Sequence, residues 1–466
     1  MQRPSPSQPT IRTAVLVGLV FTALLVELSP LGAQTMDAAL ARAYVSNPTL
    51  NAERASVRVT NESVPQALSG YRPRITASAD IGASITDARI PGGGNSTSRL
   101  GPRGAGVQID QTLFDGGKTR SAVSQAESQV LGARAVLRNI EQNVLLDAAT
   151  SYMNVLRDTA ILTLNRNNVE VLDEQVRQTR GRFEAGEVTT TDVAQSQARL
   201  SQAQSQAILA ESNLKTSIAR YRQNVGAEPR QLAPGRPVES LLPKSLPAAL
   251  NAALASHPVI IASLHGVDAA EFQIKVTQAD LYPVLSVRGL VQQRYDEEAF
   301  GDKVRSAGVF GTLTIPIYEG GQVYSRTRQA KETAGQRRIE VDTQRDTVRA
   351  AVVSAWGSNE AAKAQIAAAQ SQVRAAETAL SGVREEAKAG QRTTLDVLNA
   401  QQELVIARSS LVTAQRDRVV ASYTALSAIG RLSAETLGLK TEIYNSRRHY
   451  DQVKGLLWGT QTPDGR

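Results

Sequence analysis

The chain has 466 residues, of which 41% are hydrophobic and only 4% aromatic, so its composition suits long, thin helical packing better than a thick globular core. It contains no cysteine, which excludes thiolate catalysis, cysteine-ligated zinc and lipid attachment through a cysteine. The formal net charge of +8 is spread along the chain without basic runs that carry interleaved aromatics, and no nucleic-acid partner is predicted.

The N-terminus has the pattern of a secretory signal peptide. Arg3 and Arg12 precede an apolar run from Ala14 to Leu28, which only Glu27 interrupts. At about 15 residues the run is short for a bilayer-spanning helix, and small residues follow it where cleavage would occur. We therefore expect an exported protein, with a retained membrane anchor as the alternative. No later segment has 18 consecutive apolar residues, so any later crossing should use strands.

The rest of the chain is an internal duplication. Gly116 recurs as Gly320 and Gly186 as Gly390, so the halves match at an offset of 204 residues over their helical parts. Near the start of each half the offset becomes 210, because loops differ in length. The duplication predicts these divisions: signal peptide 1–33, first repeat 34–228, Pro-rich linker 229–246, second repeat 247–432, and a C-terminal equatorial segment with its tail, 433–466.

Each repeat contains two segments in which apolar and polar residues alternate, the pattern of a β-strand with one apolar face. The four predicted strands are residues 75–86, 105–114, 284–294 and 306–317. Their length of about ten residues suits a tilted membrane strand, although a soluble sandwich strand would alternate in the same way. Four strands cannot close a membrane barrel, whereas three chains would supply twelve and leave a lumen. Aromatic residues that could form a membrane-interface belt lie at the strand ends: Tyr71, Phe114, Tyr282 and Tyr318.

After each strand pair, apolar residues recur every seventh position, which predicts long coiled-coil helices. In the first repeat the heptads begin at Val123, and the step from Val144 to Val155 is a stutter. A helix over 118–184 would be roughly 100 Å long, far beyond the diameter of a globular domain. Return helices follow the tip glycines Gly186 and Gly390.

Together these features resemble the TolC-type outer-membrane efflux and secretion channel family over essentially the whole mature chain. The residues that carry the resemblance are the paired Asn47-Pro48 and His257-Pro258, the Gly-Gly turns Gly116-Gly117 and Gly320-Gly321 that end the strands, and the helical turns at Gly186 and Gly390. The resemblance implies a homotrimer with a twelve-stranded barrel in the outer membrane of a Gram-negative bacterium and a helical tunnel in the periplasm. It also implies two partners, a periplasmic membrane-fusion adaptor and an inner-membrane transporter of the ABC or RND type.

The resemblance further implies a gate at the helical tips. Thr191, Asp192 and Arg392 match an ionic and hydrogen-bonded lock between neighbouring hairpins, and Asp396 would line the constriction. A second pore acid of the family is Asn399 here, and a gating tyrosine is Ala387. Capping explains Thr-x-x-Asp at both tips without any gate. The expected adaptor contacts are Gly186, Glu187, Val188, Gly390 and Gln391.

No motif in the chain indicates an enzyme, a cofactor or a metal site. Lys118-Thr119 follows two glycines, but Thr112 stands where a phosphate loop needs its first glycine. His257, His265 and His449 lack the spacing of a zinc hydrolase. We expect a passive export duct for secreted proteins or small toxic molecules; the alternative is a periplasmic coiled-coil scaffold without a pore.

Overall fold

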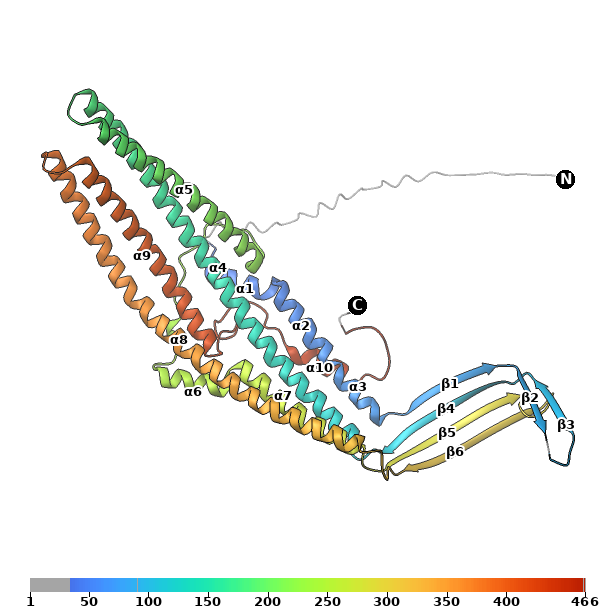
Figure 1. Cartoon of the computed structure of the whole chain (residues 1–466). Helices are drawn as coiled ribbons and strands as arrows, with labels where there is room; N and C mark the ends of the chain where they lie inside the picture. Colours follow the sequence, from blue (N-terminus) through green and yellow to red (C-terminus); the bar gives the residue numbers. More distant parts are fainter. Residues whose placement is uncertain (1–33, 90, 464, 466) are drawn as a thin grey trace, which may run out of the picture.

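The computed structural model describes residues 34–89, 91–463 and 465, and the predicted signal peptide lies outside them. The described chain is an elongated body of helices, with a sheet of strands projecting from one end and two helical hairpins ending at the other (Figure 1). Two hairpin tips and one sheet therefore lie at opposite ends of the molecule.

The main sheet has four strands: β1 Arg74–Ile81, β4 Arg103–Phe114, β5 Val284–Tyr295 and β6 Lys303–Thr314. Their order is β1-β4-β5-β6, and every neighbouring pair is antiparallel. The first repeat supplies β1 and β4, and the second supplies β5 and β6. Each outer strand has one free edge, and an unpaired edge exposes backbone donors and acceptors that another chain can satisfy.

The sequence prediction of one continuous strand over 75–86 was wrong. β1 ends at Ile81, and residues 84–100 form a separate two-stranded sheet of β2 Ser84–Arg89 and β3 Asn95–Leu100. The break lies at Gly82 and Pro102: the Gly82 N–H donates to the Pro102 carbonyl at 2.8 Å in the register of the β1–β4 ladder, but Pro102 has no N–H to donate back. The last strand ends at Thr314, three residues earlier than predicted, because Pro316 has no N–H to donate.

Two helices of 67 residues dominate the body: α4 Lys118–Glu184 and α8 Gln322–Lys388. At 1.5 Å per residue each is about 100 Å long, as the heptads predicted. The shorter α5 Thr190–Val225 returns along α4, and α9 Thr394–Ala428 returns along α8. The two hairpins lie side by side, joined mainly by contacts between α4 and α9 (Figure 1).

Shorter helices fill the wall where α5 and α9 stop. The helices α1 Met36–Ser46, α2 Pro48–Asn61 and α3 Ser63–Leu68 pack on α4. In the second repeat, α6 Leu246–Ser256 packs on α8, and α7 Pro258–Ala279 lies between α4 and α8. The short α10 Ser446–Val453 packs on α2, and single 3₁₀ turns occupy 69–71 and 239–241.

Among the described residues one helical stretch, Leu246–Ala279, has the length and apolar composition of a membrane span. Uninterrupted apolar runs had led us to expect none after the N-terminus. The stretch is the α6–α7 pair, which changes direction at His257-Pro258. Since α7 packs against both long helices, its apolar residues contribute to the helical wall.

The largest core lies midway along the helices, where both hairpins meet the linker and the C-terminal segment. Tyr152 is fully buried, and its hydroxyl lies 2.6 Å from the Ala233 carbonyl and 2.8 Å from that of Gln34. The backbone N–H of Ala434 donates to Glu141 at 2.8 Å. This middle region therefore holds the long helices, the linker and the C-terminal segment together.

Candidate functional site: the two hairpin tips

Both tips make the same left-handed turn. Gly186 and Gly390 each have a φ of +77°, which favours glycine because a side chain would be strained there. In the first tip the Glu187 N–H donates to the Arg182 carbonyl at 2.8 Å, and in the second the Gln391 N–H donates to the Glu386 carbonyl at 2.9 Å. These bonds close the last turn of each long helix, so the adaptor-contact residues predicted from sequence lie in the two exposed loops.

Each return helix begins with a complete capping box. Asp192 accepts from the Thr189 N–H at 2.9 Å and from its hydroxyl at 2.7 Å, while the Asp192 N–H donates back to the Thr189 hydroxyl. Thr393 and Asp396 repeat this arrangement. The bonds from the threonines hold the pKa of both carboxyls below its usual range. Both predicted gate acids therefore serve as helix caps.

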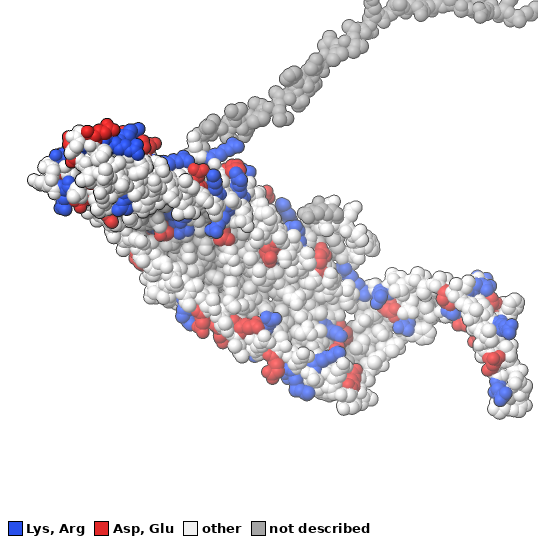
Figure 2. All heavy atoms as spheres, turned by 45° about the horizontal axis from the view of Figure 1, so that its top comes forward, with Lys and Arg blue, Asp and Glu red and all other residues white. Residues whose placement is uncertain are grey.

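The predicted lock does not form within one protomer. Arg392 pairs with Glu386 in its own hairpin at 2.8 Å instead of with Asp192 in the other. The first tip carries the matching pair with reversed polarity, because Arg182 lies on the helix and Glu187 in the loop, 3.0 Å apart. Figure 2 shows acidic and basic side chains gathered at the hairpin ends. Each pair is exposed, and solvent screening leaves such pairs little effect on stability.

A different contact joins the two hairpins, between the tips and the middle of the helices. Arg199 on α5 donates to the Asn399 side chain on α9 at 2.8 Å. Two residues further along α9, Gln401 donates to Asn168 on α4 at 3.4 Å and accepts from Arg384 at 3.0 Å. Sequence analysis had named Asn399 but missed Arg199, since nothing along the chain indicates which face of α5 meets α9.

An open hollow of about 360 Å³ also lies between the two hairpins. Its lining contains amide and hydroxyl side chains and two aliphatic residues, and no charged side chain: Asn165, Gln206, Gln365, Gln402, Val405, Ile406, Ser409, Ser410 and Thr413.

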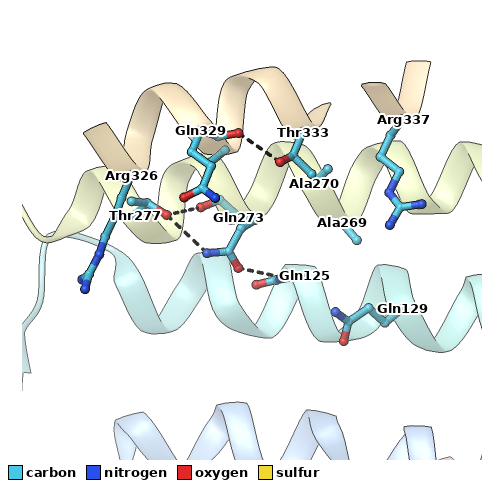
Figure 3. A pocket seen from close by; sticks show the side chains of 12 residues that line it. Gln125, Gln129, Ala269, Ala270, Gln273, Thr277, Arg326, Gln329, Thr333 and Arg337 are labelled. Atoms are coloured by element: carbon cyan, nitrogen blue, oxygen red, sulfur yellow. Dashed lines mark hydrogen bonds between the residues drawn. The ribbon is translucent and has the colours of Figure 1, made fainter. Parts of the chain in front are cut away.

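A larger hollow of about 580 Å³ lies between α4, α7 and α8, near the sheet (Figure 3). Gln125 donates to the Gln273 side chain at 2.9 Å, and Gln273 donates to Thr277 at 3.2 Å. Arg326 and Arg337 lie on the α8 side of the hollow (Figure 3). Small residues of α7 and α8 leave this space open, and it lies far from the predicted gate.

The turns between strands and long helices use the four predicted glycines: Gly116, Gly117, Gly320 and Gly321 all have positive φ. In the first turn the Asp115 carboxylate accepts from the Gly117 N–H at 3.0 Å and from the Thr119 N–H at 2.7 Å. Asp115 therefore satisfies the first free donors of α4. Among the described residues, no group of three or more His, Asp or Glu side chains is arranged to hold a metal ion.

Comparison with known proteins gives a consistent result. The model of the outer membrane efflux protein family matches residues 39–227 and 249–431. The outer membrane efflux protein BepC of Brucella suis is 43% identical over 93% of both chains. The outer membrane protein TolC of Escherichia coli is 26% identical over 85% of this chain and 82% of its own. The alkaline protease secretion protein AprF of Pseudomonas aeruginosa is 28% identical over 68% of this chain and 67% of its own.

Solved structures share the fold. A membrane protein from Pseudomonas aeruginosa superposes with a TM-score of 0.77 at 18% identity, covering 86% of this chain and 91% of that one. The CmeC outer membrane channel of Campylobacter jejuni superposes with a TM-score of 0.74 at 15% identity, covering 97% and 98%. Both likenesses extend over the helices and the strands together.

Proposed function

The chain belongs to the outer membrane efflux protein family, and from this premise we propose that three copies form the passive exit duct of a tripartite export system. The observation that carries the proposal is the direct connection of a membrane-type sheet to helices about 100 Å long. Two tight turns, at Gly116-Gly117 and Gly320-Gly321, make that connection in each chain. Neither a coiled-coil scaffold nor a soluble sandwich needs this combination.

The sheet has the faces that a shared barrel requires. One face carries apolar cross-strand rows, such as Ala77, Val107, Val291 and Ala307. The opposite face carries ion pairs, including Asp110 with Arg288 at 2.9 Å and Asp80 with Arg294 at 3.1 Å. A membrane barrel places the apolar face toward lipid and the polar face toward the lumen. Pairing the free edges of β1 and β6 around a three-fold axis closes twelve strands.

Small toxic molecules are the first candidate cargo, because the relative with 43% identity is named an efflux protein. Secreted proteins are the second candidate cargo, because AprF, which is 28% identical, is named for secretion of a protease. Deletion of the gene should lower the minimal inhibitory concentrations of several toxic compounds if efflux is correct. Loss of one exported protein from the medium, with unchanged drug sensitivity, would favour secretion.

We place the gate at the tips and add one contact to it. In the closed trimer, Thr191, Asp192 and Arg392 of neighbouring hairpins meet across the three-fold axis, and Asp396 and Asn399 line the constriction. The Arg199–Asn399 bond holds the two hairpins of each protomer together. A periplasmic adaptor docks on the tip loops around Gly186 to Val188 and Gly390 to Gln391. Docking favours the open arrangement, and an inner-membrane transporter supplies the energy.

Single-cysteine labelling tests the barrel, because the chain has no native cysteine. Val309→Cys lies on the apolar face and Thr312→Cys on the polar face of the same strand. In outer-membrane preparations a water-soluble thiol reagent should label Thr312→Cys and leave Val309→Cys unreacted. Equal labelling, or recovery of the wild-type chain as a soluble monomer, would contradict the duct and favour the scaffold.

A further inference from the structure

One end of the main sheet lies far from the helices (Figure 1). At that end the residues on the apolar face change from aliphatic to polar and cationic. Near the helices most residues of its cross-strand rows are apolar, as in the row of Ile75, Ile109, Gly289 and Val309. Further out, Arg305 replaces an aliphatic residue, and the last row contains Arg103, Tyr295 and Lys303. We call Arg103, Gln293, Tyr295, Lys303 and Arg305 the rim cluster.

The side chains of the rim cluster are held in place by one another. The Tyr295 ring lies between two cations, with its centroid 5.4 Å from the Arg103 guanidinium carbon and 5.5 Å from the Lys303 ammonium nitrogen. Arg305 donates to the Gln293 side chain at 3.1 Å, and the Gln293 amide contacts the Tyr295 hydroxyl. All three cationic residues are exposed. The cluster is therefore partly ordered before any ligand arrives.

The rim cluster itself carries three cations. Of the acids in the adjoining loop, Glu297 pairs with Arg294, Asp302 accepts from backbone N–H groups of the loop, and Glu298 is exposed. Asp296 lies 2.5 Å from Arg103 and offsets that one charge. Neither Lys303 nor Arg305 has a carboxylate within 4.0 Å in the described part of the chain. Each chain therefore presents two unpaired cations on this face, and a trimer would present them three times around its circumference.

The depth of the cluster matches a membrane interface. From Leu313 to Lys303 the strand rises about 33 Å along its own direction, which a tilt of 35–45° reduces to about 25 Å, the height of the lipid-facing band of a membrane barrel. The aromatic residues Tyr282 and Tyr318 lie exposed at the helix end of this band. Because the helices extend into the periplasm, the rim cluster lies at the level of the outer-leaflet headgroups.

We propose that the rim cluster binds the phosphate groups of a phosphorylated glycolipid of the outer leaflet, of the lipid A type. The inference rests on the proposed membrane orientation of the sheet. Phosphate oxygens are strong acceptors for Arg and Lys, and the cations project on the side that contacts lipid instead of the lumen. At that depth and on that side the available anion is a lipid headgroup.

The test uses trimers of the chain purified without the predicted signal peptide. The probe is bisphosphorylated lipid A in mixed micelles. If each cation contributes about fivefold, the double variant Lys303→Gln/Arg305→Gln should weaken lipid binding about 25-fold. The control, Arg328→Gln/Lys331→Gln, removes two exposed cations of α8 that form no ion pair with any described residue, and it should bind like wild type. Dephosphorylated lipid A should bind all three proteins equally weakly.

Equal affinity of wild type for the two lipids would overturn the inference, and so would an unchanged affinity of Lys303→Gln/Arg305→Gln. Arg103 stays intact in these variants because its removal would leave Asp296 unpaired. Trimer mass and channel conductance are measured first on each protein. Failure of the wild type to form a conducting trimer would reject the proposed function, whereas a conducting trimer without phosphate preference would reject only the rim site. If the double variant does not assemble, the comparison of phosphorylated with dephosphorylated lipid A on the wild-type trimer still tests the rim site.

Discussion

The two Gly-Gly turns are nearly identical in sequence and φ, yet their surroundings differ. A Cβ added at Gly116 would lie 2.6 Å from the Tyr282 Cβ and 3.1 Å from the Ala279 carbonyl, whereas nothing lies within 4 Å of the same position at Gly320. We expect Gly320→Ala to cost about 1 kcal/mol through its positive φ alone. Gly116→Ala should cost about 2 kcal/mol more, because α7 would have to move. Thermal unfolding of the trimer in detergent measures both, and equal losses would contradict the packing at Gly116.

His257 makes the second repeat pH-sensitive at the start of α7. Its Nδ1 accepts from the Val259 N–H at 3.3 Å, so capping requires the neutral ring, and burial lowers the pKa of His257. Below the unfolded value of about 6.5 the unfolded chain binds a proton that the folded chain resists, so stability decreases as pH falls from 7 toward 5. Asn47 caps α2 in the same way without titrating.

His257→Asn should therefore unfold with less pH dependence than wild type over that range. The measurement is the midpoint of thermal unfolding at pH 7 and pH 5, with Asn47→His as the reciprocal variant, which should gain pH dependence. Parallel curves for wild type and His257→Asn would show that His257 does not carry the effect. Sequence analysis could pair Asn47-Pro48 with His257-Pro258 because the X-Pro signal is local. It could not supply the burial, because the chain that approaches His257 is the end of the second hairpin, where a Cβ added at Gly430 would lie 2.8 Å from the His257 Cα.

The side-chain contacts between the long helix and the return helix differ between the two hairpins. In the first, buried Asp158 on α4 accepts from the Ser217 hydroxyl on α5 at 2.5 Å and from Arg157 at 2.8 Å. The positions 204 residues later are Ala362 and Ala421. Ser217→Ala leaves one carboxylate oxygen without its partner and should destabilise the hairpin by about 1–3 kcal/mol.

The double variant Asp158→Ala/Ser217→Ala copies the alanines of the second hairpin and should recover most of that loss, because no buried carboxylate remains. Denaturant titration or hydrogen exchange along α4 and α5 would measure both changes. A double variant less stable than Ser217→Ala would mean that the ion pair with Arg157 is a net source of stability.

The Arg199–Asn399 contact between the hairpins gives a sharper test of the gate than substitutions in either tip. Arg199→Gln breaks the bond to Asn399, whereas Arg384→Gln breaks the bond to Gln401 within the second hairpin. At about 0.5 kcal/mol for each exposed contact, three broken contacts should raise the open population about tenfold. Single-channel recording should then show a higher open probability for Arg199→Gln alone. Identical recordings for both variants would remove Arg199 from the gate.

At the scale of elements, local signals predicted the long helices well. Gly-Gly turns and Ala-Gly tips bracket α4 and α8, and heptads fill the interval, so their bounds followed from sequence. The split of the first strand was missed because Pro102, which lacks the N–H that would complete the ladder opposite Gly82, lies 20 residues further along the chain. The partner of Arg392 was missed for a related reason, since Glu386 meets it across the tip turn.

At the scale of the whole molecule, the number of strands per chain indicated the number of chains in the assembly better than any single residue did. Four antiparallel strands with two free edges cannot close alone, and the two 67-residue helices require a partner surface along their length. The exposed apolar residues Ile208 and Leu209 on α5 and Ile339 on α8 lie along that length. Sequence reasoning reached a trimer by counting strands and by resemblance, but the lateral packing between chains depends on surfaces that no single chain completes.

The most direct test of the account is the conductance of the purified, signal-free protein in a planar bilayer, recorded on material whose mass in detergent is known. We predict a trimer that gives small, discrete conductance steps, with Arg199→Gln opening more often than wild type. A monomer that never inserts, or a trimer that inserts without conducting under any variant, would contradict an exit duct.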